Sequence, residues 1–154
     1  MFGGGQMDID EAVEIYSEKY SVPGGLIKAI IQAESASNQY AVRYEPHYRW
    51  TVEPFDKFHW SEKTEEISQK TSWGLMQIMG AVARERGFEG RYLAELCTVK
   101  VGIKYGTKHL KWQYDRYGDW HDAISAYNQG SNRKTNGEYN NQEYVDKVLK
   151  FWEG

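Results

Sequence analysis

The stretch Leu26-Ile-Lys-Ala-Ile-Ile-Gln-Ala-Glu34-Ser35 is an apolar run that ends in a carboxylate. Its apolar residues recur every three to four positions, which predicts an amphipathic helix with one buried face. Glu34 follows Ile30 by one turn and therefore lies beside that face. Partial burial disfavours the charged form of a carboxyl group and raises its pKa, as a general acid working near neutral pH requires. The alternative is a solvated glutamate in the last turn of a surface helix.

The composition predicts one ordinary folded domain over residues 1–154. A chain of 154 residues, 40% hydrophobic and 27% charged, can bury a sizeable core without metals or disulfides. The single Cys97 excludes an intramolecular disulfide, and the four histidines are scattered, so we expect no metal and no other cofactor. The net charge of −3 argues against nucleic acid as the main partner. We expect a monomer.

The amino terminus, Met1–Asp8, lacks a basic start followed by an apolar segment. No apolar run elsewhere approaches the length of a membrane-spanning helix. The sequence therefore predicts neither a signal peptide nor insertion into a membrane.

Periodicity and capping residues predict a mainly α fold without strands. The expected helices cover residues 8–20, 23–35, a short helix from Ser61, 74–86 as a helix or a turn followed by a helix, 98–117, 119–128 and a last helix from about 141. Tyr92–Leu96 is expected to form a short turn and Gly130–Gly137 a polar loop. Gly102 and Gly106, one turn apart, predict a close contact with another helix.

Residues 41–72 are the least regular part of the chain, with two prolines and many of the aromatic rings that make up 15% of the sequence. Long irregular segments in compact domains are usually functional or disordered, and so many rings argue for order. Aromatic rings can stack on sugars, although most belong to cores. The segment could fold over the body and line a cleft, or it could form a small satellite core.

Three short motifs lie on different predicted helices: Glu34-Ser35, Gly74-Leu-Met-Gln77-Ile-Met79 and Ala126-Tyr127-Asn128. In this order they resemble the catalytic domain of soluble lytic transglycosylases, a lysozyme-like fold related to goose-type lysozyme. The resemblance spans about Pro23 to Phe151, and it implies that residues 23–152 form the core of the domain. Weaker features that match are Ile103, Gly106 and Leu110 at their spacing, a Tyr-Gly-Asp before the third motif, and Tyr144-Val145.

The resemblance implies cleavage of the β-1,4 bond between N-acetylmuramic acid and N-acetylglucosamine in peptidoglycan, with a 1,6-anhydromuramic end as product. Glu34 would protonate the glycosidic oxygen and then, as a carboxylate, take the proton of the muramic 6-hydroxyl as that oxygen attacks its own anomeric carbon. A lysozyme-like hydrolase would need a second carboxylate. The candidates for it are Glu45, Glu53 and Asp56.

The supporting roles follow from motif position. Tyr127 would lie over Glu34 with its hydroxyl within hydrogen-bonding reach. Gln77 and Asn128 would offer amide groups to the glycan, or would act as structural caps, and Met79 would form an apolar floor. The remaining candidates for substrate contact are Ser35, Gly74, Tyr44 and Glu45.

Two of these candidates have a structural alternative, and the sequence departs from the family twice. Ser35 is expected to brace the helix end, and Gly74 to permit close approach of the backbone to a ligand or a neighbouring helix. Gly-Leu-Met-Gln follows Glu34-Ser35 later than in common family members, so residues 41–72 look like an insertion. Gly80 stands where the family often has proline. The insertion leaves open whether water or the 6-hydroxyl attacks.

Peptidoglycan strands are the expected partner. The rivals to a transglycosylase are the hydrolase, a non-catalytic glycan-binding module and a helical protein-interaction domain. Without a signal sequence, we expect a phage or prophage protein that acts on the cell wall, either released at lysis or carried in a virion.

Overall fold

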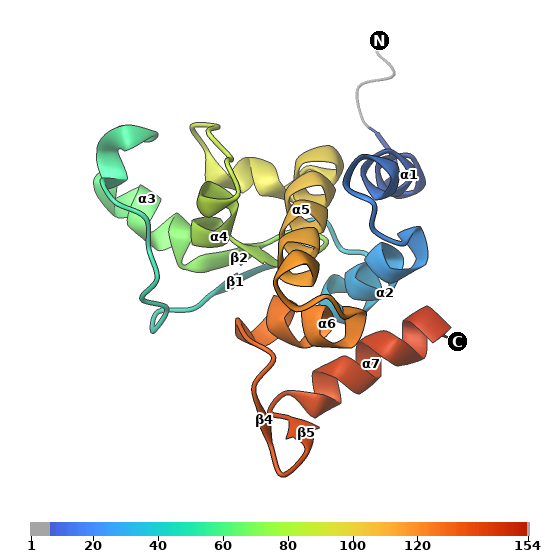
Figure 1. The fold of residues 1–154 in the computed structure, drawn as a ribbon. Helices are drawn as coiled ribbons and strands as arrows, with labels where there is room; N and C mark the ends of the chain where they lie inside the picture. Colours follow the sequence, from blue (N-terminus) through green and yellow to red (C-terminus); the bar gives the residue numbers. More distant parts are fainter. Residues whose placement is uncertain (1–6, 154) are drawn as a thin grey trace.

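The computed structural model describes residues 7–153 and is built mainly from helices (Figure 1). The helices are α1 (Ile9–Tyr20), α2 (Gly24–Ser35), α3 (Glu62–Gln69), α4 (Gly80–Glu85), α5 (Val99–Tyr117), α6 (Trp120–Gln129) and α7 (Gln142–Glu153), with 3-10 turns η1 (Phe55–Lys57) and η2 (Leu93–Cys97). The predicted mainly α class is confirmed. Residues 1–6, on which the signal-peptide prediction depends, lie outside the described residues.

Capping side chains set the ends of several helices. Asp8, Ser61, Thr98 and Asp119 each accept the backbone N–H of the third residue that follows. Each cap satisfies a donor that the first turn of a helix leaves without a partner. Gly118 ends α5 in the left-handed conformation. The predicted boundaries of these helices are therefore confirmed to within a residue or two.

The core forms around α2. This helix packs on α1 and α7, while α5 packs on α1 and α6 (Figure 1). The apolar side chains of α2 that the periodicity assigned to the core are fully buried, and they are Leu26, Ile27, Ile30 and Ile31. Burial of each such side chain stabilises the fold by about 1.5–3 kcal/mol. Because this stripe holds α2 in the core, Glu34 in its last turn is carried to the edge of the core.

The two glycines of α5 permit the close approach that their spacing predicts. A Cβ atom at Gly106 would lie 2.5 Å from Met76 Sδ, and one at Gly102 would lie 2.5 Å from the Leu96 carbonyl oxygen. The partners are the turn that carries Met76 and the 3-10 turn η2. The predicted close contact is confirmed, but its partner is not another α-helix.

A small antiparallel sheet was not expected from the sequence. Its strands are β1 (Val42–Tyr44), β2 (Thr71–Trp73) and β3 (Ile78–Met79), in the order β1-β2-β3. Val42 pairs with Trp73, and Trp73 with Ile78. A hairpin of β4 (Lys134–Thr135) and β5 (Glu138–Tyr139) interrupts the predicted polar loop. Strands of two or three residues are too short to produce a readable alternation.

Residues 74–86 adopt the second of their two expected forms, a turn followed by β3 and α4. Gly80 begins α4 at a crowded point, because a Cβ atom there would overlap the carbonyl oxygen of Ser68. A proline ring would meet the same obstacle. The departure from the family pattern at Gly80 therefore follows from the way α3 and α4 pack.

The irregular segment is ordered and packs partly on α4 through α3. Glu65 of α3 is 1% exposed and forms a two-pronged ion pair with Arg84 of α4, with both N–O distances at 2.9 Å. A second apolar cluster lies beside this pair and contains Ile78, Ala83, Phe88, Leu93 and Leu96. None of these five residues belongs to residues 41–72, so the segment joins the body through the Glu65–Arg84 pair, and its interpretation as a satellite core stays a prediction.

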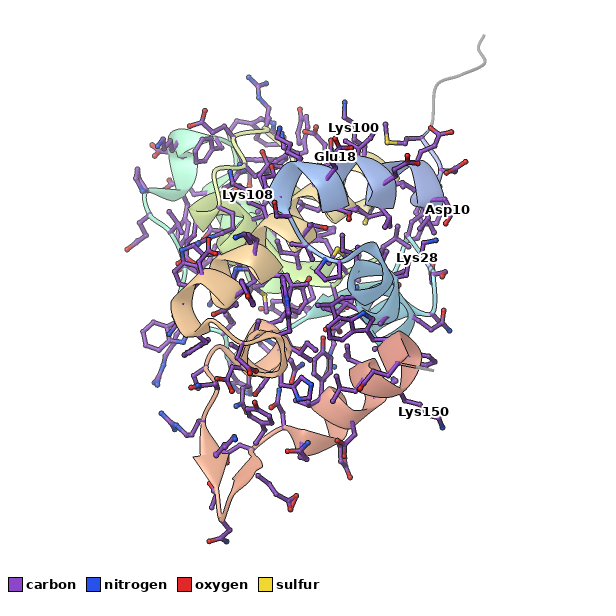
Figure 2. The ribbon with its side chains drawn as sticks, turned by 45° about the vertical axis from the view of Figure 1, so that its right-hand side comes forward. Asp10, Glu18, Lys28, Lys100, Lys108 and Lys150 are labelled. Atoms are coloured by element: carbon purple, nitrogen blue, oxygen red, sulfur yellow. The ribbon has the colours of Figure 1, made fainter. Side chains whose placement is uncertain are left out.

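Charged side chains cover the outer faces of the helices. Lys28 on α2 lies 3.0 Å from the carboxylate of Asp10 at the start of α1. Both residues are labelled in Figure 2. Both side chains are exposed, so this pair contributes at most about 1 kcal/mol. Within residues 7–153, none of the helices has the combination of length and hydrophobicity that a bilayer crossing demands.

Candidate active site

A cleft of about 470 Å³ opens beside the last turn of α2. Its walls come from β1 and the loop after it, the turn before β3, and the facing sides of α5 and α6. Of the residues predicted for the site, the cleft lining contains Glu34, Glu45, Gln77, Met79, Tyr127 and Asn128. A second hollow, of about 770 Å³, lies against α1 and α2 and is lined by none of the predicted site residues.

Glu34 is half-buried in the wall of this cleft. Burial raises the pKa of its carboxyl from 4.5 to about 7, although the Tyr144 hydroxyl and the charges of Lys147 and Arg43 lower it in part. The sequence prediction of a partly desolvated carboxyl with a raised pKa is confirmed. Near neutral pH the group populates both protonation states, so it can both donate and accept a proton.

The hydroxyl that contacts Glu34 belongs to Tyr144 of α7. It donates to Glu34 Oε2 at 2.9 Å. The expectation that the Tyr127 hydroxyl would reach Glu34 is wrong in this structure, because that hydroxyl donates to the Met76 carbonyl oxygen at 2.7 Å. The physical reason is that Met76 lies in a buried turn whose carbonyl needs a donor, whereas α7 packs along α2 and presents Tyr144 to its last turn.

The two tyrosines remain hydrogen-bond donors at any physiological pH. Burial, followed by the nearby charge of Glu34, raises the pKa of both Tyr127 and Tyr144 well above 10. A neutral hydroxyl on Tyr144 can orient the carboxyl of Glu34 and stabilise its charged form. Tyr127 has no such contact with Glu34; its bond to Met76 holds the turn that leads into β3.

Gln77 and Asn128 face the cleft and also have partners within the protein. Gln77 Nε2 donates to the carbonyl oxygens of Ala41 at 2.9 Å and Gly74 at 3.0 Å. Asn128 Oδ1 accepts from Asn141 Nδ2 at 2.9 Å. These bonds support a structural role for both residues. Because both side chains also line the cleft, they remain candidates for contact with the substrate.

Three predicted residues lie outside the cleft lining. Ser35 Oγ donates to the Leu75 carbonyl oxygen at 2.8 Å, which joins the end of α2 to the second motif as a brace. Gly74 has a φ of +75°, and a Cβ atom there would lie 2.5 Å from the Leu96 carbonyl oxygen, so its close approach is to η2. Tyr44 is 53% exposed, because strand alternation turns it away from the side of β1 that lines the cleft.

Sequence reasoning missed His109 as a cleft residue. It lies on the buried side of α5, and burial together with the charges of Arg86 and Arg116 lowers its pKa to about 3. The imidazole is therefore neutral. No motif signals its position; only its place between Gly106 and Leu110 on the buried face could have indicated it.

Sequence reasoning also missed Tyr144, whose only signal is the Tyr144-Val145 pair in the last helix. Nothing in that pair indicates a contact with the first motif. The structure also offers no obvious metal site, since no three His, Cys, Asp or Glu side chains gather at binding distance within residues 7–153.

Comparison with known proteins agrees with this fold. The family model described as the transglycosylase SLT domain matches residues 11–149. The chain therefore belongs to the transglycosylase SLT family, and the predicted family and lysozyme-like fold are confirmed. A protein named transglycosylase from Enterobacteria phage PRD1 is 26% identical over 140 residues, which cover 91% of this chain and 41% of that protein. The chain thus spans about two fifths of the length of that relative.

Proposed function

We propose that this protein is a peptidoglycan lytic transglycosylase in which Glu34 is the single acid and base. The observation that carries the proposal is the carboxyl of Glu34, which lies in the cleft with a pKa of about 7. An ordinary surface glutamate would be ionised at that pH and could not act as an acid. Membership of the SLT family supports glycan cleavage as the chemistry.

The reaction needs one proton to leave Glu34 and one to return. The protonated carboxyl donates to the glycosidic oxygen, and the bond from that oxygen to the muramic anomeric carbon breaks. The carboxylate then takes the proton of the muramic 6-hydroxyl, whose oxygen bonds to the same carbon. The products are a 1,6-anhydromuramic end and an N-acetylglucosamine 4-hydroxyl, and no water is consumed.

Neighbouring side chains support this cycle. Tyr144 orients the carboxyl of Glu34 and donates to it when it is charged. Met79 lies in the cleft lining as an apolar floor, and Gln77 and Asn128 present amide edges that suit acetamido groups and hydroxyls. Tyr127 holds the Met76 turn in place and so fixes the motif that carries Gln77 and Met79.

A hydrolase on the same fold is the second candidate, because Glu45 lines the same cleft as Glu34. The Arg43 guanidinium lies 2.9 Å from the Glu45 carboxylate and holds it beside the cleft. A carboxylate in that position could activate a water molecule, which would attack the anomeric carbon in place of the 6-hydroxyl. The products would then carry reducing ends.

The proposal includes where the protein acts and which kind of genome encodes it. The relative from phage PRD1 bears the name transglycosylase. We extend this to action on the bacterial cell wall by a phage or prophage protein, either released at lysis or carried in a virion. We propose that it works as a monomer.

Mass analysis of the soluble products from purified peptidoglycan tests the proposal. We expect anhydro ends, which are lighter than reducing ends by one water, and a loss of roughly 10²–10⁴-fold in rate for E34Q. E53Q is the matched control, since Glu53 is exposed and lies outside the cleft lining. Reducing ends that disappear in E45Q would establish the hydrolase, and full activity of E34Q would remove Glu34 from the chemistry.

A further inference from the structure

We propose that residues 45–52 form a fixed wall of the cleft that binds a sugar ring by stacking, with Trp50 as the stacking platform. The inference rests on the proposed function, since it assigns a glycan contact within the same cleft. Its ligand is an uncharged N-acetylhexosamine unit of the glycan strand, recognised through the apolar face of the sugar.

Trp50 combines exposure with a place in the cleft. Its side chain is 65% exposed, and it lines the same cleft as Glu34. Tryptophan is usually well buried, so an indole left open to solvent inside a cleft is suited to being covered by a ligand. Exposure alone does not place an indole in the cleft. Trp60 is 79% exposed but lies outside the cleft lining.

A second aromatic residue shares this wall. Tyr48 also lines the cleft, two positions before Trp50 in a run without helix or turn. Both side chains therefore face the same cleft. Burial, followed by the charge of Glu85, raises the pKa of Tyr48 to about 12, so its hydroxyl stays neutral. The wall thus offers an apolar ring and a hydroxyl, which match the two kinds of surface on a sugar.

Both ends of the wall are hydrogen-bonded to the body of the protein. The backbone N–H of Glu45 donates to the Lys70 carbonyl oxygen at 2.7 Å. At the other end, the side-chain amide of Gln69 pairs with the backbone of Val52: its Oε1 accepts from the N–H at 2.6 Å and its Nε2 donates to the carbonyl at 2.9 Å. These two bonds reproduce the pairing that a neighbouring strand would provide.

The Gln69 side chain that holds Val52 is itself fixed by buried charged groups. Gln69 is 1% exposed, and its Nε2 also donates to Glu65 Oε2 at 2.8 Å. Glu65 in turn is held by the two-pronged pair with Arg84 of α4. The position of the wall is therefore set by α3 and α4 before any ligand binds. A preorganised wall loses little conformational freedom on binding, which favours affinity.

Other groups at the wall suit the same ligand. The guanidinium of Arg49 lies 5.3 Å from the Trp50 ring centroid and supports the indole through a cation–π contact. Arg43, just before the wall, and Glu45, at its first position, both line the cleft and supply polar groups for sugar hydroxyls. The combination of one platform and several polar edges favours a sugar over a purely apolar ligand.

Calorimetric binding of the N-acetylglucosamine hexamer tests the inference, with E34Q as the parent protein so that the ligand stays intact. We expect W50A in this parent to weaken binding about 3- to 10-fold, in line with the contribution of one well-placed aromatic contact. W50F should recover part of the affinity. W60A is the matched control, since it removes an even more exposed indole from the same segment, and its affinity should match the parent within about twofold.

The outcomes separate the inference from the function on which it rests. Equal affinities of W50A and the parent would overturn the stacking wall while leaving the transglycosylase proposal intact. If E34Q does not bind the hexamer although the wild-type protein digests peptidoglycan, the wall is also overturned as a site for uncharged sugar rings. Absence of both binding and digestion would remove the proposed function, and the wall with it.

Discussion

Replacement of Glu34 by glutamine should stabilise the folded protein at alkaline pH. The pKa of this carboxyl is about 7 in the folded chain and 4.5 as its ordinary value. Its contribution to stability is therefore most favourable below pH 4.5 and is lost as the pH rises from 4.5 through about 7. The full difference corresponds to about 3 kcal/mol, since each pKa unit is worth 1.36 kcal/mol. Glutamine keeps the size and the hydrogen-bonding oxygen but has no charge to desolvate.

Urea unfolding of the wild-type protein and E34Q at pH 4, 6 and 8 measures this difference. We expect equal free energies of unfolding at pH 4, and an advantage for E34Q at pH 8 that approaches about 3 kcal/mol, or roughly 6–12 °C in Tm. E53Q controls for the loss of one surface charge. If E34Q and the wild-type protein are equally stable at pH 8, or if the wild-type protein is the more stable there, burial does not raise the pKa of Glu34 and the reasoning fails.

Two further substitutions test contacts that hold the cleft together. Y144F removes the hydroxyl that lowers the pKa of Glu34, so the alkaline limb of the pH–rate profile should move from about pH 7 to higher pH by roughly one unit; an unchanged limb would show that the contact does not tune the carboxyl. G106A should destabilise the protein by about 1–3 kcal/mol in urea unfolding, because its Cβ atom would lie 2.5 Å from Met76 Sδ. G24A is the control, since its nearest contact is an ordinary 3.5 Å, and a similar loss of stability in both variants would argue against crowding at Met76.

The helices were predictable because their signals are local. Each capping residue acts on a backbone group three positions away, and an apolar stripe repeats with the helical period whatever it packs against. The apolar residues of α2 therefore predicted the buried face, and Asp119 and Gly118 predicted the break between α5 and α6. The small sheet was missed for the opposite reason. Its strands pair Val42 with Trp73, far along the chain, and none is long enough to show a period.

The candidate site was predictable to the extent that its residues belong to motifs. Glu34, Gln77, Met79, Tyr127 and Asn128 meet in one cleft, as their order in the family pattern predicted. The motifs say which residues come together, but they do not say which atoms touch.

The tyrosine hydroxyl that contacts Glu34 illustrates that limit. Tyr144 donates to a residue 110 positions away, a contact that exists only because α7 packs along α2. Tyr127, the residue that the motif favours, instead satisfies a buried carbonyl oxygen. The choice between the two tyrosines depends on where polar groups are left without partners after the helices pack, and a sequence does not contain that information.

The sequence by itself determined the helical class, the family and the glutamate at the end of a buried stripe, because periodicity and capping depend on neighbouring residues and the order of the motifs can be read along the chain. Only the tertiary structure decided that this glutamate has a pKa of about 7, that Tyr144 is its partner and that Trp50 joins it in the cleft. Desolvation and hydrogen bonding depend on which groups surround an atom in space. Those surroundings are assembled from segments that the chain keeps far apart.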